Sequence, residues 1–140
     1  MVSIQETTGF LLAQVCRTRR NLVAVTVEPF GLHVGQDLIM VELWNEEGLT
    51  QSQLAERVGI DASTMTKTLQ RLERYGFVER QQDKDDTRVW RVCLTNEGRA
   101  LKPTVTERWN EAEQRTFAGF TAEEHVLLRS FLERIEQNLA

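Results

Sequence analysis

Apolar residues recur along most of the chain at intervals of three and four, the spacing that places them on one face of an α-helix. This pattern predicts six helices. Helix-capping and helix-stopping residues set their expected bounds, at residues 7–27, 35–46, 50–58 and 61–74, from residue 95 through residue 112, and from residue 121 to residue 139. A mainly α-helical fold follows.

Polar residues mark the expected starts of three of these helices. Thr50 with Gln53, and Thr121 with Glu124, have the spacing of a capping box, in which two side chains satisfy backbone N–H groups at the helix start. Asp61 is a favourable N-cap for the fourth helix. We therefore expect helices to begin directly after Thr50, Asp61 and Thr121.

Each helix carries an apolar stripe that we expect to be buried. In chain order the stripes consist of Leu11, Val15, Thr18, Leu22 and Val25; Leu38, Ile39, Val41 and Trp44; Leu54 and Val58; Met65, Leu69 and Leu72; Leu101, Val105, Trp109 and Ala112; and Leu128, Phe131, Leu132, Ile135 and Leu139. The fourth helix is polar on its opposite face, so it is predicted to lie at the surface.

After residue 76 the hydrophobic period becomes that of a strand. Residues 77–80 and 89–94 are short β-type runs, and the polar residues 81–87 between them predict a hairpin tip. The third and fourth helices, joined by a tight turn near Gly59, predict a helix-turn-helix, and the hairpin that follows makes it a winged helix-turn-helix. The expected fold class is therefore mainly α (α+β).

The first, fifth and sixth helices carry more apolar surface than a helix-turn-helix core can cover. We expect it to be buried between two copies of the chain. The alternative is that the terminal helices pack on each other within one chain. The 140 residues are interpreted as one chain, with a winged helix-turn-helix lobe at residues 33–98 and dimerisation helices at residues 1–32 and 99–140.

Composition and charge indicate an ordinary globular protein and argue against a membrane-spanning one. The chain is 41% hydrophobic and 27% charged with 8 Gly and 2 Pro, as in an ordinary globular domain. It has no apolar run near the ~20 residues of a membrane span and no basic flank of a secretory signal, so a cytoplasmic location is expected. The net charge is -4, yet residues 51–91 hold eight basic and seven acidic residues, which leaves +1 there and -5 elsewhere.

The sequence offers little chemistry for an enzyme. Cys16 and Cys93 lie far apart, and His33 and His125 are the only histidines. No metal-ligand spacing, Gly-rich phosphate loop or nucleophile motif is present, so we expect no metal, no cofactor and no enzymatic activity.

The polar face of the fourth helix has the side chains that read base edges in the DNA major groove. The start of the third helix offers hydroxyls and free backbone N–H groups that suit phosphate oxygens. Arg88, oriented by Asp86, is expected to enter the minor groove; its alternative role is a surface ion pair. The candidate DNA-binding residues are Thr50, Gln51, Ser52, Ser63, Thr64, Thr66, Lys67, Gln70, Arg71, Asp86 and Arg88. Arg91 and Lys84 are further candidates for phosphate, and Arg74 and Arg80 for ion pairs with Glu73 and Glu79.

Residues 49–98 resemble the MarR-type (multiple antibiotic resistance regulator) family of winged helix-turn-helix transcriptional regulators. The resemblance rests on TQSQLAERVGI, on a Ser/Thr-rich start of the recognition helix, on RLERYGFVER, and on the wing pattern of Asp86 and Arg88 followed by Leu94, Thr95 and Gly98. Lys84 stands where the family often has Pro. The resemblance implies a homodimeric regulator, expected to be a repressor, that binds a pseudo-palindromic double-stranded DNA operator and responds to a small molecule or an oxidant.

A small-molecule effector is expected in a crevice between the dimerisation helices and the DNA-binding lobe. The residues that we expect to line it are Arg19, His33, Trp44 and Trp109. One alternative is a redox-sensing regulator that uses Cys16, since some family members sense peroxide through a cysteine in the first helix. We expect Cys16 to be a buried, inert residue instead. A second alternative is a winged-helix protein-interaction module without operator specificity.

Overall fold

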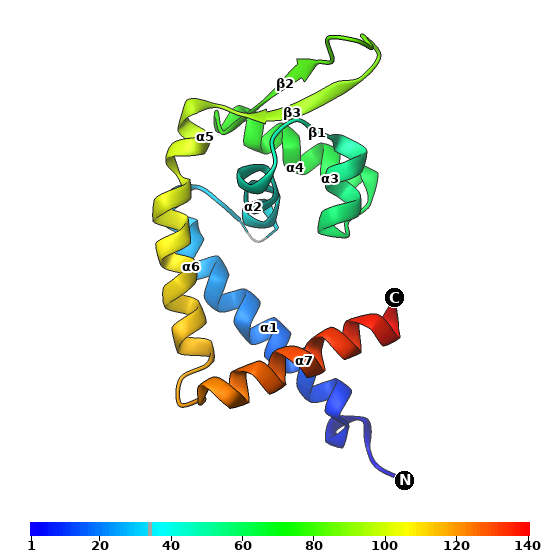
Figure 1. Cartoon of the computed structure of the whole chain (residues 1–140), viewed down its shortest axis with the longest axis vertical. Helices are drawn as coiled ribbons and strands as arrows, with labels where there is room; N and C mark the ends of the chain where they lie inside the picture. The colour runs from blue at the N-terminus through cyan, green and yellow to red at the C-terminus, as the bar shows by residue number, and fades with distance from the viewer. Residues whose placement is uncertain (34) are drawn as a thin grey trace.

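The computed structural model describes residues 1–33 and 35–140, and it confirms a mainly helical fold with a small sheet (Figure 1). Its elements are α1 (Thr8–Val27), α2 (Gln36–Asn45), β1 (Leu49–Thr50), α3 (Gln51–Val58), α4 (Ala62–Arg74), β2 (Val78–Gln82), β3 (Trp90–Leu94), α5 (Asn96–Ala100), α6 (Lys102–Thr116) and α7 (Ala122–Leu139). Short 3-10 helices precede and follow α1, at Ile4–Glu6 and Glu28–Phe30.

The predicted helix starts are confirmed because capping depends only on neighbouring residues. The Thr50 hydroxyl accepts from the Gln53 N–H at 3.2 Å, and the Gln53 side chain accepts from the Thr50 N–H at 2.9 Å. The same reciprocal pair joins Thr121 and Glu124 at the start of α7. Asp61 caps α4 by accepting from the Thr64 N–H at 2.8 Å.

The single fifth helix predicted after Thr95 is wrong, because the structure divides it into α5 and α6 at Leu101. Pro103 lies in the first turn of α6, where its missing N–H costs nothing. In one continuous helix its ring would clash with the carbonyl of the residue four positions earlier. The chain therefore begins a new helix at Lys102.

The sheet has three antiparallel strands in the order β1-β3-β2. Val78 lies opposite Leu94 and Gln82 opposite Trp90, so β2 and β3 form the predicted hairpin. The two-residue strand β1 was not predicted; Leu49 and Thr50 pair with Val92 and Arg91 of β3. This strand leads directly into α3, so the sheet connects the wing to the helix-turn-helix.

The core lies beneath α4 and the sheet. Met65, Leu69 and Leu72 of α4 and Leu54 of α3 are fully buried, as their stripes predicted. Val58 is partly buried, and Val105 and Ala112 of α6 are buried.

The predicted buried face of α2 is only partly right. Ile39 is buried as expected, but Leu38 and Val41 are exposed at 44% and 39%. Met40 and Leu43 are fully buried instead, because the core touches the neighbouring side of this helix. Trp44 is partly buried, and its indole N–H donates to the Gly98 carbonyl at 2.9 Å.

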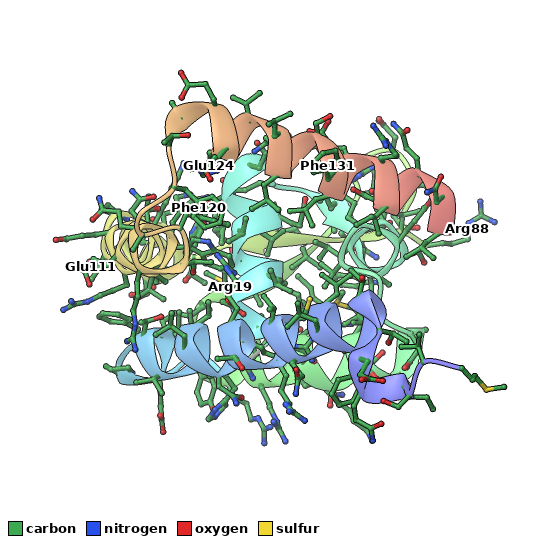
Figure 2. The ribbon with its side chains drawn as sticks, turned by 90° about the horizontal axis from the view of Figure 1, so that it is seen from below. Arg19, Arg88, Glu111, Phe120, Glu124 and Phe131 are labelled. Carbon is green, nitrogen blue, oxygen red and sulfur yellow. The ribbon has the colours of Figure 1, made fainter. Side chains whose placement is uncertain are left out.

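The two ends of the molecule differ. Figure 1 shows α3, α4 and the wing gathered at one end, and the N-terminal half of α1 and α7 at the other. Figure 2, turned by 90°, shows α1 and α7 along opposite sides of the molecule. No residue of α7 is buried. Packing of terminal helices within one chain is therefore seen for α1 with α6, but it does not bury the stripe of α7.

Within the described residues, no helix combines the length and the apolar character that crossing a membrane requires.

Candidate nucleic-acid interface

A tight left-handed turn joins α3 to α4. Gly59 ends α3 at φ +76°, a conformation that glycine adopts without the penalty of a side chain. The N–H groups of Gly59 and Ile60 both donate to the Ala55 carbonyl, at 2.9 and 3.1 Å. Asp61 then caps α4 directly, so the turn holds the two helices at a fixed angle.

Asp61 organises the first turn of α4. Besides the Thr64 N–H, its carboxylate accepts the Ser63 hydroxyl at 2.7 Å and the Thr64 hydroxyl at 2.9 Å. These donors, the Thr64 N–H first, lower the pKa of Asp61 from 3.8 to about 2. Ser63 and Thr64 are exposed, but both of their hydroxyl groups donate to Asp61. These hydroxyl oxygens can therefore act only as acceptors for a ligand.

Gln51 and Thr66, two of the predicted DNA-contact residues, contact each other. The Gln51 side-chain amide donates to the Thr66 hydroxyl, which in turn donates to the Ala62 carbonyl at 2.9 Å. Both residues are partly buried. This pair links the first residue of α3 to the second turn of α4.

The outer face of α4 is polar and cationic. Lys67, Gln70 and Arg71 are exposed, and none makes a side-chain hydrogen bond or ion pair with another residue of the described chain. The neighbouring Glu73 is occupied, because its carboxylate accepts from the Arg80 Nε at 2.6 Å. One of the ion pairs expected for Arg80 is thus confirmed, and the basic groups of α4 remain accessible.

The start of α3 lies beside this face. Ser52 is exposed, and Thr50 is partly buried with its hydroxyl bound to the Gln53 N–H. Of the three residues predicted to meet phosphate here, only Ser52 has a side chain that is both exposed and without a hydrogen-bond partner among the described residues.

The wing tip holds the arginine that sequence reasoning singled out. The Arg88 Nε and Nη2 donate to Oδ1 and Oδ2 of Asp86 at 3.1 and 3.2 Å, a bidentate pair. This pair is the main cause of the lowered pKa of Asp86. The Arg88 side chain is nevertheless 89% exposed, and Figure 2 shows it extending from the edge of the molecule. Asp86 therefore orients a guanidinium that is open to solvent.

Arg91, by contrast, is not a free cation. Its Nε and Nη2 donate to Oδ2 of Asp83 at 3.1 and 2.9 Å, and its Nη1 donates to the Gly48 carbonyl at 2.8 Å. Its interpretation as a phosphate contact stays a prediction, since the guanidinium is already held by these two acceptors. Lys84, at the tip, is exposed.

Two open cavities lie against α2 and α6. One, of about 470 Å³, is lined by Val41 and Trp44 of α2 and by Val105 and Trp109 of α6, among others. The other, of about 220 Å³, is lined by Arg19 together with other residues of α1, by residues of α2 and by Trp109. Three of the four predicted effector residues therefore line a cavity.

Arg19 reaches α6 from α1. Its guanidinium lies 5.8 Å from the centre of the Trp109 ring and pairs with Glu113 at 3.1 Å. His33, the fourth predicted effector residue, is exposed and is not among the residues that line either cavity.

Asp37 is a site residue that the sequence did not reveal. Only 3% of Asp37 is exposed, the residue lines the smaller cavity, and its carboxylate accepts from the Gly35 N–H at 3.1 Å. Burial raises the pKa of this carboxyl. An acidic residue in the first turn of a helix is an ordinary pattern, so the sequence alone gave no signal of its burial.

The expectation that Cys16 is buried is wrong. Its thiol is exposed, and the residue lines the smaller cavity. Cys93 on β3 is partly buried, and burial raises the pKa of its thiol. No group of three or more His, Cys, Asp or Glu side chains within residues 1–33 and 35–140 is arranged to hold a metal ion.

A model of the MarR family matches residues 32–90. The chain is 36% identical over 91 residues to the HTH-type transcriptional regulator PecS of Dickeya dadantii (strain 3937), which covers 65% of this chain and 55% of PecS. It is 23% identical over 128 residues to the HTH-type transcriptional regulator YybA of Bacillus subtilis (strain 168), covering 91% and 85% of the two chains. The chain spans less than two thirds of the length of several other relatives that it matches, as it does for PecS.

The fold agrees over nearly the whole chain with a solved MarR transcriptional regulator from Methanosarcina mazei Go1. The TM-score is 0.84 at 28% identity, with 94% of this chain and 95% of that chain covered. Residues 32–90 therefore form a MarR family domain, and the fold of the chain is that of solved MarR transcriptional regulators.

The matched residues 32–90 extend from just before α2 to the first residue of β3. Every candidate DNA-contact residue from Thr50 to Arg88 lies inside that stretch. The helices α1, α5, α6 and α7 lie outside it but are covered by the structural match.

Proposed function

We propose that this regulator binds double-stranded DNA as a homodimer, at a pseudo-palindromic operator, and acts as a repressor that a small molecule releases. The observation that carries DNA binding is the exposed cationic face of α4 together with the solvent-exposed, carboxylate-oriented guanidinium of Arg88. A helix of this width fits the major groove, and an arginine at a hairpin fits the narrow minor groove.

The side chains of α4 differ in the contact that each is suited to make. Arg71 and Gln70 carry planar groups with two hydrogen-bonding atoms, which suit the paired atoms of a guanine and an adenine edge. Lys67 carries a point charge on a flexible stem and suits phosphate. Gln51 and Thr66 are assigned a supporting role, because they bond to each other.

Charge favours DNA over a protein partner. A winged helix that binds only protein is expected to present a neutral recognition face, whereas Lys67, Arg71 and Arg74 give this face three exposed cations. The protein-interaction module is therefore the weaker candidate.

Exposed apolar surface supports the homodimer. On α7, Phe131, Leu132 and Ile135 are exposed at 49%, 42% and 37%, and on α1 Leu11 and Val15 are exposed at 58% and 49%. Contiguous apolar stripes on two helices are unusual for a monomer in water and are typical of subunit interfaces. We assign residues 33–98 to the DNA-binding lobe and residues 1–32 and 99–140 to dimerisation.

The two cavities support effector binding. Both include Trp109 of α6, and both lie between α2, which enters the DNA-binding lobe, and helices of the dimerisation region. A ligand that prefers one relative position of these helices would change the spacing of the two α4 helices in a dimer. Such a change would release DNA.

Redox sensing through Cys16 is a second candidate, favoured by the exposure of its thiol beside Arg19 and Arg20 in the smaller cavity. Under this proposal, peroxide lowers the DNA affinity of the wild type but not of Cys16→Ser. Equal loss in both proteins would exclude it.

Fluorescence anisotropy with labelled duplex DNA over a series of salt concentrations tests DNA binding. Contacts to phosphate release counterions, so log K is expected to fall linearly and steeply with log salt. Absence of binding at low salt, or a flat slope, would contradict the proposal and favour a protein partner.

A further inference from the structure

Arg91 connects three segments that are far apart in the sequence. It lies on β3, opposite Thr50 of β1, the residue that caps α3. Its guanidinium reaches the Asp83 carboxylate at the wing tip with two N–H groups, and the Gly48 carbonyl before β1 with a third. One planar group thus ties the tip of the wing to the entrance of the helix-turn-helix.

The wing needs such a support. Beyond Thr50 the sheet has only two strands, and an isolated two-stranded ribbon is marginally stable in water. Arg80 and Arg91 lie on opposite faces of the ribbon, because Arg80 pairs with Val92 while Arg91 pairs with Gln81. Arg80 binds Glu73 of α4 on one face, and Arg91 binds Gly48 on the other.

Asp83 transmits this support to the tip. Its second carboxylate oxygen accepts from the Asp85 N–H at 2.8 Å, and its own N–H donates to the Val89 carbonyl at 2.8 Å. The segment closed by these bonds contains Asp86 and Arg88.

We propose that Arg91 is a positioning residue that holds the wing tip, and with it the guanidinium of Arg88, at a fixed orientation to α3 and α4. It acts through Arg88 and does not itself contact DNA. This inference rests on the proposed DNA binding of the wing.

Charge-preserving and charge-removing variants separate positioning from a phosphate contact. Arg91→Lys keeps the cation but loses the planar fork that spans two acceptors. Asp83→Asn removes a negative charge near DNA, so electrostatics alone would strengthen binding. The Asp83→Asn side chain keeps a carbonyl oxygen that accepts from the Asp85 N–H, but it presents an amide group in place of the oxygen to which Arg91 donates. Asp85→Asn is the matched control, because this exposed carboxylate makes no side-chain hydrogen bond with the other described residues.

The probe is a labelled duplex recovered from randomised DNA with the wild-type protein. We expect Arg91→Lys and Asp83→Asn each to weaken binding by about tenfold, the scale of a lost charge-assisted contact, with the salt slope of Arg91→Lys unchanged. Asp85→Asn is expected to bind as tightly as the wild type or more tightly. In an Arg88→Ala background, Arg91→Lys is expected to cause no further loss, because the group that it positions is absent.

Wild-type affinity in Arg91→Lys, or tighter binding in Asp83→Asn, would overturn the inference, as would an equal further loss in the Arg88→Ala background. Thermal melts of each variant distinguish a misplaced wing from an unfolded protein. If Arg91→Lys and Asp83→Asn both lose affinity and both show a large fall in Tm, the positioning role of Arg91 is also overturned. Wild-type protein that binds no DNA would instead refute the proposed function, so the two failures are distinguishable.

Discussion

Helices α4 and α7 carry the same kind of apolar stripe, but the stripe of α4 is buried and the stripe of α7 is exposed. On α4, Met65, Leu69 and Leu72 are fully buried against the rest of the chain. On α7, Phe131 and Ile135 occupy equivalent spacings and stay exposed. Both helices begin with a side-chain cap, so the difference does not lie in how the helices form.

The difference lies in what the chain places opposite each stripe. The tight turn at Gly59 and the sheet bring α3 and β2 against α4, whereas the long α6 carries α7 away from them (Figure 1). A periodic pattern therefore specifies a helix and its apolar face, while the partner of that face depends on topology. For α7 we propose that the partner is a second copy of the chain.

Charging the α7 stripe is expected to have the largest effect. Phe131→Glu combined with Ile135→Glu places two carboxylates in the proposed interface, and an unpaired buried charge costs more than about 3 kcal/mol. The dimer should dissociate or the protein should aggregate, as measured by size-exclusion chromatography with light scattering. Ser130→Glu, on the same helix but outside the stripe, should remain dimeric. A wild-type protein that is monomeric at micromolar concentration would refute the dimer.

Truncating the α4 stripe should lower the stability of the fold itself. Leu69→Ala removes a fully buried side chain and leaves a cavity in the core, which costs about 2 to 5 kcal/mol. Lys67→Ala, on the outer face of the same helix, should change the free energy of unfolding by less than about 0.5 kcal/mol. Urea denaturation measures both, and equal effects would show that the two faces of α4 are not different.

Removing the wing guanidinium should affect DNA binding and leave the fold intact. Arg88→Ala is expected to lower DNA affinity and to make the salt slope shallower by about one unit. Arg108→Ala is a suitable control, because Arg108 is also an exposed arginine paired with a nearby acid, Glu111 at 3.2 Å, but lies on α6. If Arg88→Ala and Arg108→Ala have the same slope as the wild type, the pair with Asp86 is only structural.

The smallest effect concerns the cap of α4 and its dependence on pH. The folded-state pKa of Asp61, about 2, is below its ordinary value of 3.8, so its stabilisation is complete above about pH 4 and is lost as the pH falls through 2. Asp61→Ala should lower Tm by a few degrees at pH 6. That difference should shrink as the pH falls through 2. Asp61→Asn, which keeps a capping acceptor, should melt close to the wild type at pH 6. A Tm difference between wild type and Asp61→Ala that does not change with pH would contradict this origin.

The parts of the structure that sequence could predict depend on residues close together in the chain. The caps at Thr50, Asp61 and Thr121 involve partners three positions away, and the Asp86–Arg88 pair spans two. Even the missed division between α5 and α6 had a local signal in Pro103.

Contacts between residues far apart in the sequence could not be predicted from the sequence. Gln51 lies 15 residues from Thr66, and Arg91 lies 43 residues from Gly48, so both looked like free polar groups. The exposure of Cys16 and the burial of Asp37 likewise depend on which elements surround them. Sequence thus located the candidate interface on α4 and the wing, but it did not separate side chains that are free to contact DNA from those that hold the interface in shape.

Selection of binding sites from randomised duplex DNA tests the central claim most directly, because it reports base reading and two-fold symmetry together. The wild-type protein is expected to enrich an inverted repeat whose half-sites lie about one helical turn, ~10 bp, apart. Arg71→Ala should relax the preference at one symmetric base pair per half-site, whereas Lys67→Ala should return the wild-type motif. No enriched motif, or a single unrepeated half-site, would contradict a dimeric winged-helix regulator that reads DNA through α4.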